Sequence, residues 1–329
     1  MLKSIMIVGC GSIGQRHARN ARKIGIRDII LCDLDMDRLK KFAKEIDTDL
    51  LFASYQEAVE KYPDVEAAVI ATPSGLHIQP AMFLAGHGIH LFVEKPLSSN
   101  LSGIDDLIEL ADRKRIVAMM GQSYRFHEGF LELKKLLDSE VLGKIQHVSY
   151  SGGQYLPDWH PDMDYRKEYA AQRRLGGGVI LTSMSHSYDT VQWLFGDITR
   201  QVAWKSKLSD LEIDVEDSVF CLLMTDRGII VQCEADFTLR ENRHLMSIAC
   251  ERGQIDADFV AQTIRIWTID DRKPRTITCG FEGNRRYVDE LRHFAGLVEG
   301  GIVRHDLDLS TGKKIMKLML SDDIDEVGK

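Results

Sequence analysis

Short apolar runs and longer amphipathic stretches alternate along residues 5–120. The apolar runs have the length and composition of buried parallel strands, and they lie at residues 5–8, 28–33, 65–71, 89–93 and 116–120. Helical patterns fill the gaps between them, at residues 12–25, 37–46, 56–62, 77–85 and 101–113. Strands that alternate with helices predict an α/β fold with a doubly wound parallel sheet and right-handed crossovers.

The pattern changes after about Ser123. A helical stretch at residues 131–137 precedes longer strand-like segments, at residues 145–155, 199–207, 217–225, 228–237, 245–250, 254–259, 263–269 and 275–279. Turn signals such as Asp226-Arg227-Gly228 separate several of these segments, which predicts a large, mostly antiparallel, open sheet. Further helices are predicted at residues 178–195, 287–299 and 311–320. We therefore expect a doubly wound domain at residues 1–122 and an α+β domain for substrate binding and oligomerisation at residues 123–329.

Charge and cysteine content narrow the function classes. The 329 residues include 42 Lys and Arg against 50 Asp and Glu, a formal net charge of −8, so we expect no nucleic-acid partner. No apolar run approaches the roughly 20 residues that span a bilayer, and no signal peptide is recognised, so we expect no membrane partner and a cytoplasmic location. The six cysteines form no C-x-x-C pair and are expected to be buried free thiols, and no metal site is predicted.

Residues 9–14 read Gly-Cys-Gly-Ser-Ile-Gly, directly after the first strand and at the start of a helix. In this context G-x-G-x-x-G binds a dinucleotide: the glycines permit a tight turn, close approach of the pyrophosphate, and close packing of helix on strand. Asp33 ends the second strand, where a carboxylate accepts the ribose hydroxyls of NAD and repels a 2′-phosphate. The alternatives are a plain turn for the glycines and a helix cap or turn residue for Asp33. Arg38 is expected on a solvated helix face, and the alternative is that it weakens the preference for NAD. We predict a Rossmann domain that binds NAD in preference to NADP, through Gly9, Gly11, Ser12, Ile13, Gly14 and Asp33.

Four further motifs follow in order: Ala71-Thr72-Pro73-Ser74-Gly75-Leu76-His77, Glu94-Lys95-Pro96, Tyr124-Arg125-Phe126, and Gly176-Gly177-Gly178 followed by His186. Together with the glycine motif and its continuation Gln15-Arg16-His17, they resemble the glucose–fructose oxidoreductase / inositol dehydrogenase / rhizopine-catabolism (Gfo/Idh/MocA) oxidoreductase family. The resemblance covers nearly the whole chain, and the Glu94-Lys95-Pro96 triplet is a specific signal. It implies a Rossmann domain joined to an open-faced α/β domain, and further cofactor contacts from Thr72, Pro73, His77, Glu94 and Lys95.

Lys95 is the first candidate catalytic residue. It follows the strand at residues 89–93, and ligands bind at the carboxyl edge of such strands in open α/β sheets. In the family that this chain resembles, the corresponding lysine orients the substrate hydroxyl and aids proton movement. Pro96 can fix an unusual turn, for which a cis bond is one solution. The alternative is a loop lysine that caps the strand in solvent.

His186 is the second catalytic candidate that the resemblance implies, as a general base. An imidazole near its ordinary pKa suits removal of a hydroxyl proton at neutral pH. The family has an Asp four residues earlier, on the same helix face, where this chain has Thr182. Without that carboxylate, His186 loses a partner that would stabilise its charged form, and Asp189 is a candidate substitute. The alternative is a buried structural histidine.

The substrate site is expected to include Tyr124, Arg125, Thr182 and His186. In the stretch from Gln154 to Arg166, Trp159 and Tyr165 are candidates for stacking on a sugar face. Arg166, Arg173 and Arg174 are candidates for contacting phosphates. The resemblance implies sugars and nucleotide-linked sugars of surface-glycan pathways as substrates. The alternative for this stretch is an arm that packs on a neighbouring subunit.

These observations predict an NAD-dependent dehydrogenase that transfers hydride to or from a secondary alcohol of a sugar, cyclitol or nucleotide sugar. We expect a homodimer or homotetramer that assembles through the C-terminal sheet. Thr182 keeps open a second hypothesis, a non-catalytic sensor of the same fold that binds NAD and a sugar. A reductase for an acyclic imine or aldehyde is a third. The chain lacks the Y-x-x-x-K pattern of short-chain dehydrogenases.

Overall fold

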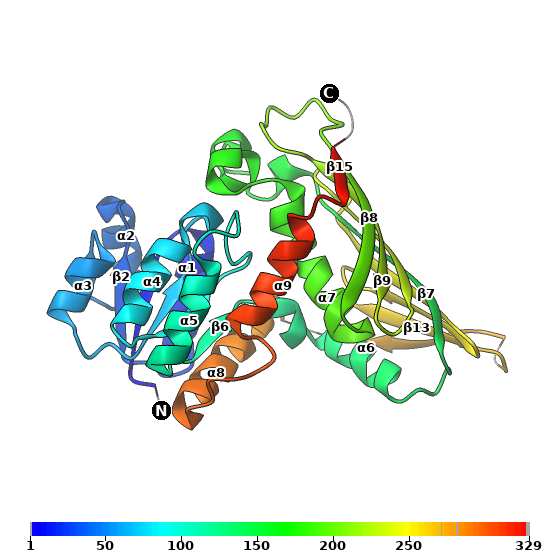
Figure 1. The fold of residues 1–329 in the computed structure, drawn as a ribbon, viewed down its shortest axis with the longest axis horizontal. Coiled ribbons are helices and arrows are strands. Elements are labelled where there is room, and N and C mark those ends of the chain that lie inside the picture. The colour runs from blue at the N-terminus through cyan, green and yellow to red at the C-terminus, as the bar shows by residue number, and fades with distance from the viewer. Residues whose placement is uncertain (1, 271, 281, 327–329) are drawn as a thin grey trace. The chain divides into compact units, whose positions relative to one another are not determined.

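A computed structural model describes residues 2–270, 272–280 and 282–326 of the chain (Figure 1). The chain divides into two compact units, and the first consists of the residues up to Ser123 together with Asn284–Lys317. The second consists of Tyr124–Gly283 and the residues from Leu318 on. The first segment of the first unit ends at Ser123, one residue from the boundary predicted after residue 122. The segment Asn284–Lys317 differs from that prediction, because it lies in the first unit although it follows the second in sequence.

A six-stranded sheet forms the centre of the first unit. Its strands are β1 (Ser4–Val8), β2 (Asp28–Cys32), β3 (Leu51–Phe52), β4 (Ala67–Ile70), β5 (His90–Val93) and β6 (Ala118–Met120). All neighbours are parallel, in the order β3-β2-β1-β4-β5-β6. The strands β1, β4 and β5 are buried almost throughout, as strands covered on both faces are. The predicted doubly wound sheet is confirmed, and its strand order reverses between β1 and β4.

Helices cover this sheet. They are α1 (Ser12–Lys23), α2 (Met36–Ile46), α3 (Tyr55–Lys61), α4 (Ile78–Gly86), α5 (Ile104–Lys114), α8 (Arg285–Gly300) and α9 (Leu309–Met319). The helix α1 packs against α2 and α8, and α4 packs against α5. Phe294 of α8 meets Phe92 of β5 edge-on, with 5.7 Å between ring centroids. The N–H of Met120 donates to the carbonyl of Leu307 (2.8 Å). These contacts explain why the segment Asn284–Lys317 belongs to the first unit.

The second unit contains a nine-stranded sheet. Its strands are β7 (Ile145–Gly153), β8 (Ile198–Ser206), β9 (Ser218–Thr225), β10 (Ile230–Asp236), β11 (Arg243–Cys250), β12 (Gly253–Asp258), β13 (Thr263–Thr268), β14 (Arg275–Thr278) and β15 (Ile324–Glu326). They are ordered β14-β13-β12-β11-β7-β10-β9-β8-β15. The pairs β7–β10 and β8–β15 are parallel and the other neighbours are antiparallel. The predicted large, mostly antiparallel sheet is confirmed.

One face of this second sheet carries the helices α6 (Glu128–Asp138) and α7 (Ser185–Phe195) (Figure 1). Side chains along β8, β9 and β10 alternate between buried and exposed, so the face away from the helices is open to solvent. A π-helical turn, Ile180–Met184, runs into α7 and interrupts the helix predicted over residues 178–195. Among the helices that the structure describes, none combines the length and apolarity needed to cross a membrane.

Candidate functional site

The glycine loop joins β1 to α1 at the point where the strand order of the first unit reverses. Gly9 has a φ of +92°, and a Cβ added there would lie 2.7 Å from the carbonyl oxygen of Ala71. A Cβ on Gly14 would lie 1.8 Å from the carbonyl oxygen of Gly9, so α1 packs too closely on the loop for any side chain. A Cβ on Gly11 would meet nothing within 4 Å. The loop is therefore packed tightly at its first and third glycines and open at its second.

The open side of this loop suits a pyrophosphate. Gly11 is the N-cap of α1 and supplies no side-chain cap, and Ser12 in the first turn is exposed while Ile13 is half-buried. Helix N-termini of this kind bind phosphate through their N–H groups. Thr72 and Pro73 follow β4 next to the loop, and Thr72 Oγ1 is buried without a hydrogen-bond partner in the described part of the chain. These residues fit the cofactor for which the glycine motif is typical.

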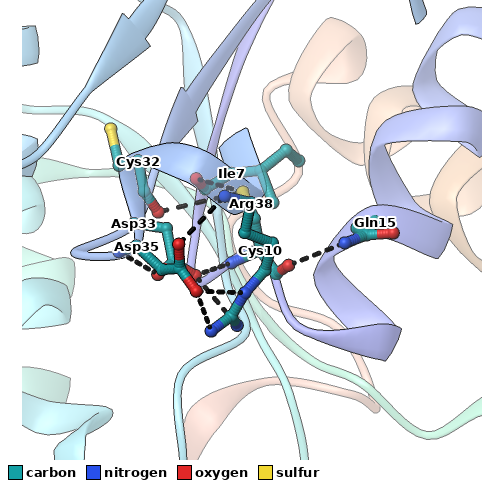
Figure 2. Close-up of polar contacts among 7 residues, drawn as sticks. All are labelled: Ile7, Cys10, Gln15, Cys32, Asp33, Asp35 and Arg38. Carbon is teal, nitrogen blue, oxygen red and sulfur yellow. Dashed lines mark hydrogen bonds and ion pairs between the residues drawn. The ribbon is translucent and has the colours of Figure 1, made fainter. Parts of the chain in front are cut away.

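Asp33 follows β2 and faces the same loop (Figure 2). Its Oδ2 accepts a hydrogen bond from the N–H of Cys10 (2.7 Å), and its Oδ1 accepts one from the N–H of Asp35 (2.9 Å). The side chain is 13% exposed. Each carboxylate oxygen has a second lone pair, so Asp33 can still accept the hydroxyls of a ribose. Asp35, and not Asp33, caps α2.

Arg38 was expected to lie in solvent, but the structure places its guanidinium beside Asp33 (Figure 2). Its Nη2 donates to Asp35 Oδ2 (3.0 Å), and its Nη1 lies 3.6 Å from Asp33 Oδ2. The Arg38 side chain remains 44% exposed. Sequence spacing alone left this contact open, because it depends on how the first turn of α2 meets the end of β2.

The Glu94-Lys95-Pro96 triplet follows β5, two strands from β1 along the sheet, and the Lys95–Pro96 peptide bond is cis. Glu94 Oε2 accepts a hydrogen bond from the N–H of Lys95 (3.2 Å). His77, only 1% exposed, lies with Nδ1 3.0 Å from the Pro96 carbonyl oxygen and Nε2 2.7 Å from that of Thr72. His77 therefore ties the loop after β4 to the turn after β5, and both its ring nitrogens face backbone carbonyls.

The environment of Lys95 changes its acid–base behaviour. Burial lowers the pKa of its amine to about 8, and the charge of Arg286 on α8 acts in the same direction, against the charge of Glu94. With a pKa of about 8, roughly one amine in ten is neutral at pH 7, compared with a negligible fraction for an ordinary lysine. A lysine with this property can give and take a proton near neutral pH.

In the second unit, His186 lies at the start of α7 and stacks on Tyr124, with 4.2 Å between ring centroids. The structure thus brings together two residues predicted for the substrate site. His244 of β11, which the sequence analysis did not single out, lies 5.0 Å from Tyr124 between ring centroids. Its Nε2 is within 2.8 Å of the hydroxyl of Tyr150, which lies on β7. A histidine in a strand-like pattern carried no signal that could have identified it beforehand.

The triple glycine before His186 has a packing role. A Cβ on Gly177 would lie 2.4 Å from the carbonyl oxygen of Tyr169, and one on Gly178 would lie 2.3 Å from Glu216 Oε1. Glu216 accepts a hydrogen bond from the N–H of Ile180 (3.2 Å), where the π-helical turn begins. Such turns are often found at functional sites. The glycines therefore allow the buried carboxylate of Glu216 to cap the helix that carries His186.

Thr182 and Asp189 were the two candidate partners of His186. The Thr182 hydroxyl donates to the carbonyl of Gly178 (2.7 Å), which uses its proton within the helix. Asp189 forms a bidentate ion pair with Arg125, at 2.9 Å from Nε and 2.7 Å from Nη2. The side chains of Arg125 and Asp189 are 9% and 1% exposed. Arg125 and Asp189 therefore hold each other inside the second unit, and a carboxylate in the family position is missing.

The stretch after β7 makes aromatic and polar contacts with Phe237, Asp164 and Glu212. Trp159 packs edge-on against Phe237, at 5.3 Å between ring centroids. The hydroxyl of Tyr165 accepts a hydrogen bond from the N–H of Glu212 (3.2 Å). Arg166 pairs with Asp164 (2.8 Å) and with Glu212 (3.0 Å). Two carboxylates thus contact the guanidinium that was predicted to bind a phosphate.

No set of three or more His, Cys, Asp or Glu side chains in the described ranges is arranged for a metal ion.

The parallel sheet, the glycine loop at its switch point and the carboxylate of Asp33 define a dinucleotide-binding protein of the Rossmann class. The chain belongs to the Gfo/Idh/MocA oxidoreductase family: residues 3–122 match the family model described as "Oxidoreductase family, NAD-binding Rossmann fold", and residues 130–256 match the "GFO/IDH/MocA C-terminal domain". The resemblance seen in the sequence, the assignment to the NAD(P)-dependent oxidoreductases and the prediction of NAD as cofactor are confirmed.

Comparisons with characterised proteins agree with this family. The chain is 27% identical over 308 residues to the myo-inositol 2-dehydrogenase of Thermotoga maritima. This aligned region covers 90% of this chain and 88% of that protein. Levoglucosan dehydrogenase in complex with NADH has a TM-score of 0.85 at 18% identity, covering 96% of this chain and 95% of that one. UDP-N-acetylglucosamine 3-dehydrogenase GnnA from Acidithiobacillus ferrooxidans has a TM-score of 0.79 at 18% identity, with the same coverage of both chains. At 18% identity, the two structures show the shared fold alone.

Proposed function

We propose that this protein is an NAD-dependent dehydrogenase for a secondary alcohol of a sugar or cyclitol. The observation that carries the proposal is Lys95, which follows β5 at the ligand-binding edge of the first sheet and has a pKa lowered to about 8. The relationship to a myo-inositol 2-dehydrogenase along most of both chains supports the substrate class.

Each candidate residue has a separate task in this proposal. Gly9, Gly11 and Gly14, with the first turn of α1, hold the pyrophosphate, and Asp33 holds the adenosine ribose. When bound, NAD supplies the acceptor for the hydride of the alcohol carbon. Lys95 orients the substrate hydroxyl and accepts or returns its proton. His186, in the second unit, is a separate candidate general base. The edge of the sheet where the cofactor binds also includes Thr72 and Pro73. His77 and Glu94 act there by holding the turn that carries Lys95.

The residues around His186 favour a polyhydroxylated ring as substrate. Tyr124 and His244 combine aromatic surface with hydrogen-bonding groups, the two features with which proteins bind sugars. The guanidinium of Arg166 is engaged by Asp164 and Glu212. A diphosphate would have to compete with these two carboxylates, so we place free sugars and cyclitols ahead of nucleotide sugars and of a role in surface-glycan synthesis.

The test mixes the purified protein with NAD and a panel of inositols, monosaccharides and nucleotide sugars, and follows the absorbance of NADH. Turnover of one free sugar or cyclitol, strongly reduced in both Lys95→Met and His186→Ala, is the expected result. Turnover confined to a nucleotide sugar would contradict the inference drawn from the engagement of Arg166 by two carboxylates. Turnover that survives both substitutions would contradict the assigned proton chemistry.

A non-catalytic sensor is the second candidate, and Thr182 is the observation that favours it. The family places a carboxylate at this position, whereas the Thr182 hydroxyl here donates to the carbonyl of Gly178. A sensor would bind NAD and a sugar but show no turnover in either direction. A Thr182→Asp variant that gains turnover which the natural chain lacks would support the sensor reading.

We also propose that the chain forms a homo-oligomer through the open face of the second sheet. Cross-strand neighbours on this face are both apolar and exposed: Val202 with Leu222, Trp204 with Phe220, and Met224 with Ile230. A contiguous apolar surface of this kind fits a second copy of the same chain. Light scattering should give an oligomeric mass that Leu222→Glu reduces to the monomer. Ile269→Glu, at a residue that is also exposed but lies outside β8–β11, is the matched control and should keep the oligomer. An unchanged mass in Leu222→Glu would contradict this interface.

A cytosolic location remains part of the proposal. All six cysteines are buried and unbridged, as in proteins of reducing compartments. Fluorescence microscopy of the tagged full-length chain in its host cell tests this, and exclusive labelling of an envelope compartment would contradict it.

A further inference from the structure

His17 is a buried histidine on α1 that the mechanism above does not use. Its side chain is fully buried, and its Nε2 lies 2.6 Å from Glu94 Oε1. The ring also meets Phe92 of β5 edge-on, at 4.9 Å between centroids. A charged or polar pair inside a sheet–helix interface costs desolvation, so its presence at this place calls for a physical reason.

Glu94 connects this histidine to the Lys95 turn. While Oε1 faces His17, Oε2 accepts the N–H of Lys95 at 3.2 Å. One carboxylate therefore bridges a side chain of α1 and the backbone of the residue to which we assign proton transfer. The Glu94 side chain is 11% exposed, so water competes little for either oxygen.

We propose that His17 is a positioning residue for Lys95 and acts through the carboxylate of Glu94. The proposal rests on the proposed function of Lys95, and it adds a residue from a different element of the fold. His17 contacts Glu94 through its side chain, and Glu94 contacts the backbone of Lys95, so Glu94 supplies the route between them.

The physical link is the charge of Glu94. Burial alone would raise the pKa of this carboxyl group, but the hydrogen bond and charge of His17, together with the charge of Lys95, bring it below its usual value. An ionised Glu94 in turn opposes the effect of burial on the Lys95 amine. His17 thus favours the ionised form of Glu94, and ionised Glu94 limits how far burial lowers the pKa of the Lys95 amine.

The other titratable and charged groups that act on Glu94 or on Lys95 come from three elements. Lys95 follows β5, Arg286 belongs to α8 and lowers the pKa of Lys95, and His77 lies beyond β4. Burial lowers the pKa of His77, against the charge of Glu94 and its backbone contacts. His17, by contrast, makes a direct side-chain hydrogen bond with Glu94. Replacement of His17 should therefore have the most direct effect on the carboxylate.

The test measures the Lys95 amine itself and needs no substrate. In the full-length protein, the pH dependence of modification by a small amine reagent is quantified at Lys95 by peptide mass spectrometry. Lys135, whose side chain is 75% exposed, is the internal reference. The natural chain should give a midpoint of about 8 for Lys95.

His17→Leu removes the donor to Glu94, so the carboxylate is protonated more easily. The Lys95 midpoint should then fall by about one pH unit or more, the size typical of losing an opposite charge at close range. His17→Gln places an amide N–H near the position of Nε2 and should restore most of the midpoint. His90→Gln is the matched control, because His90 lies on the same strand β5 and accepts a hydrogen bond from the N–H of Val117 (2.9 Å). It should leave the midpoint unchanged.

A folded His17→Leu variant with an unchanged Lys95 midpoint would overturn the proposal. If His17→Leu does not fold, Glu94→Gln decides: it keeps an acceptor for the Lys95 N–H but removes the charge, and must lower the midpoint to the same extent. An unchanged midpoint in Glu94→Gln would equally overturn the proposal. Failure of the proposed function of Lys95 has a different signature: full turnover in Lys95→Met would remove its catalytic role, and absence of turnover in the natural protein would remove the dehydrogenase function, but both would leave these midpoints as they are.

Discussion

An added methyl group should have different effects at two glycines of the cofactor loop: it should lower stability at Gly14 and weaken NAD binding at Gly11. A methyl group on Gly11 meets no atom within 4 Å, so Gly11→Ala should fold normally. A methyl group on Gly14 lies 1.8 Å from the Gly9 carbonyl oxygen, whereas real Cβ atoms are essentially never closer than 3.0 Å. The start of α1 must then move by at least 1.2 Å, the difference between these two distances.

The magnitudes follow from this geometry. Overpacking of this kind costs about 1–3 kcal/mol, from which the better helix propensity of alanine recovers about 0.5–1 kcal/mol. For a unit of this size, each kcal/mol corresponds to about 2–4 °C in Tm, so Gly14→Ala should melt a few degrees lower. For Gly11→Ala, Tm without cofactor should stay within about one degree. Its methyl group instead occupies the space that the pyrophosphate needs.

The assay is thermal unfolding with and without NAD, followed by near-UV circular dichroism. NAD at a hundred times its Kd should stabilise the natural protein by about 2.7 kcal/mol. Gly11→Ala should lose nearly all of this stabilisation while keeping its own Tm. A full NAD effect in Gly11→Ala would refute the placement of the pyrophosphate at the open glycine. An unaltered Tm in Gly14→Ala would refute the close packing of α1 on the loop.

Three further predictions concern charged groups. Asp33→Ala should weaken the binding of NAD more than that of NADP, because a carboxylate binds ribose hydroxyls, and Arg38→Gln should weaken the binding of NADP more than that of NAD, because a guanidinium binds a 2′-phosphate. Calorimetric titration measures both affinities. Equal effects of a substitution on the two cofactors would show that the residue does not discriminate between them. For alcohol oxidation, kcat/KM should rise with pH and level off above about 8 as Lys95 loses its proton, and Lys95→Met should lower turnover at least about a hundredfold and abolish that rise. Asp189→Ala leaves the Arg125 guanidinium buried without its partner and should cost about 3–5 kcal/mol in urea unfolding, whereas a loss below about 1 kcal/mol would show that the ion pair is not structurally important.

The first sheet and its cofactor loop could be predicted because their signals are local. Buried parallel strands are apolar throughout, and the three glycines act on neighbours a few residues away or on the next strand. The two-residue strand β3 was missed because it is too short for a periodic pattern. The π-helical turn was missed because its apolar residues fit an α-helical pattern equally well.

The polar contacts of the site were less accessible to sequence analysis. The ion pair of Arg125 with Asp189, the approach of Arg38 to Asp33 and the position of His244 join residues that are far apart in sequence or depend on the angle of a helix. Residue type identifies such groups as chemically capable, but only the folded backbone decides which of them meet. For the same reason, Arg125 and Arg166 looked like substrate ligands and are engaged by carboxylates of the protein itself.

The return of the segment Asn284–Lys317 to the first unit has a consequence for biosynthesis. The ribosome releases α8 only after the whole nine-stranded sheet except β15 has been translated. Until then Phe92 lacks Phe294, Asn20 lacks the amide of Asn284 (2.8 Å), and the edge of β6 lacks its bond to Leu307. The nascent Rossmann unit therefore lacks α8 and α9 while the ribosome translates most of the second unit. A fragment that contains the whole first unit must include residues 284–317 as well as the residues up to Ser123, because the cofactor-binding unit of this protein is not continuous in sequence.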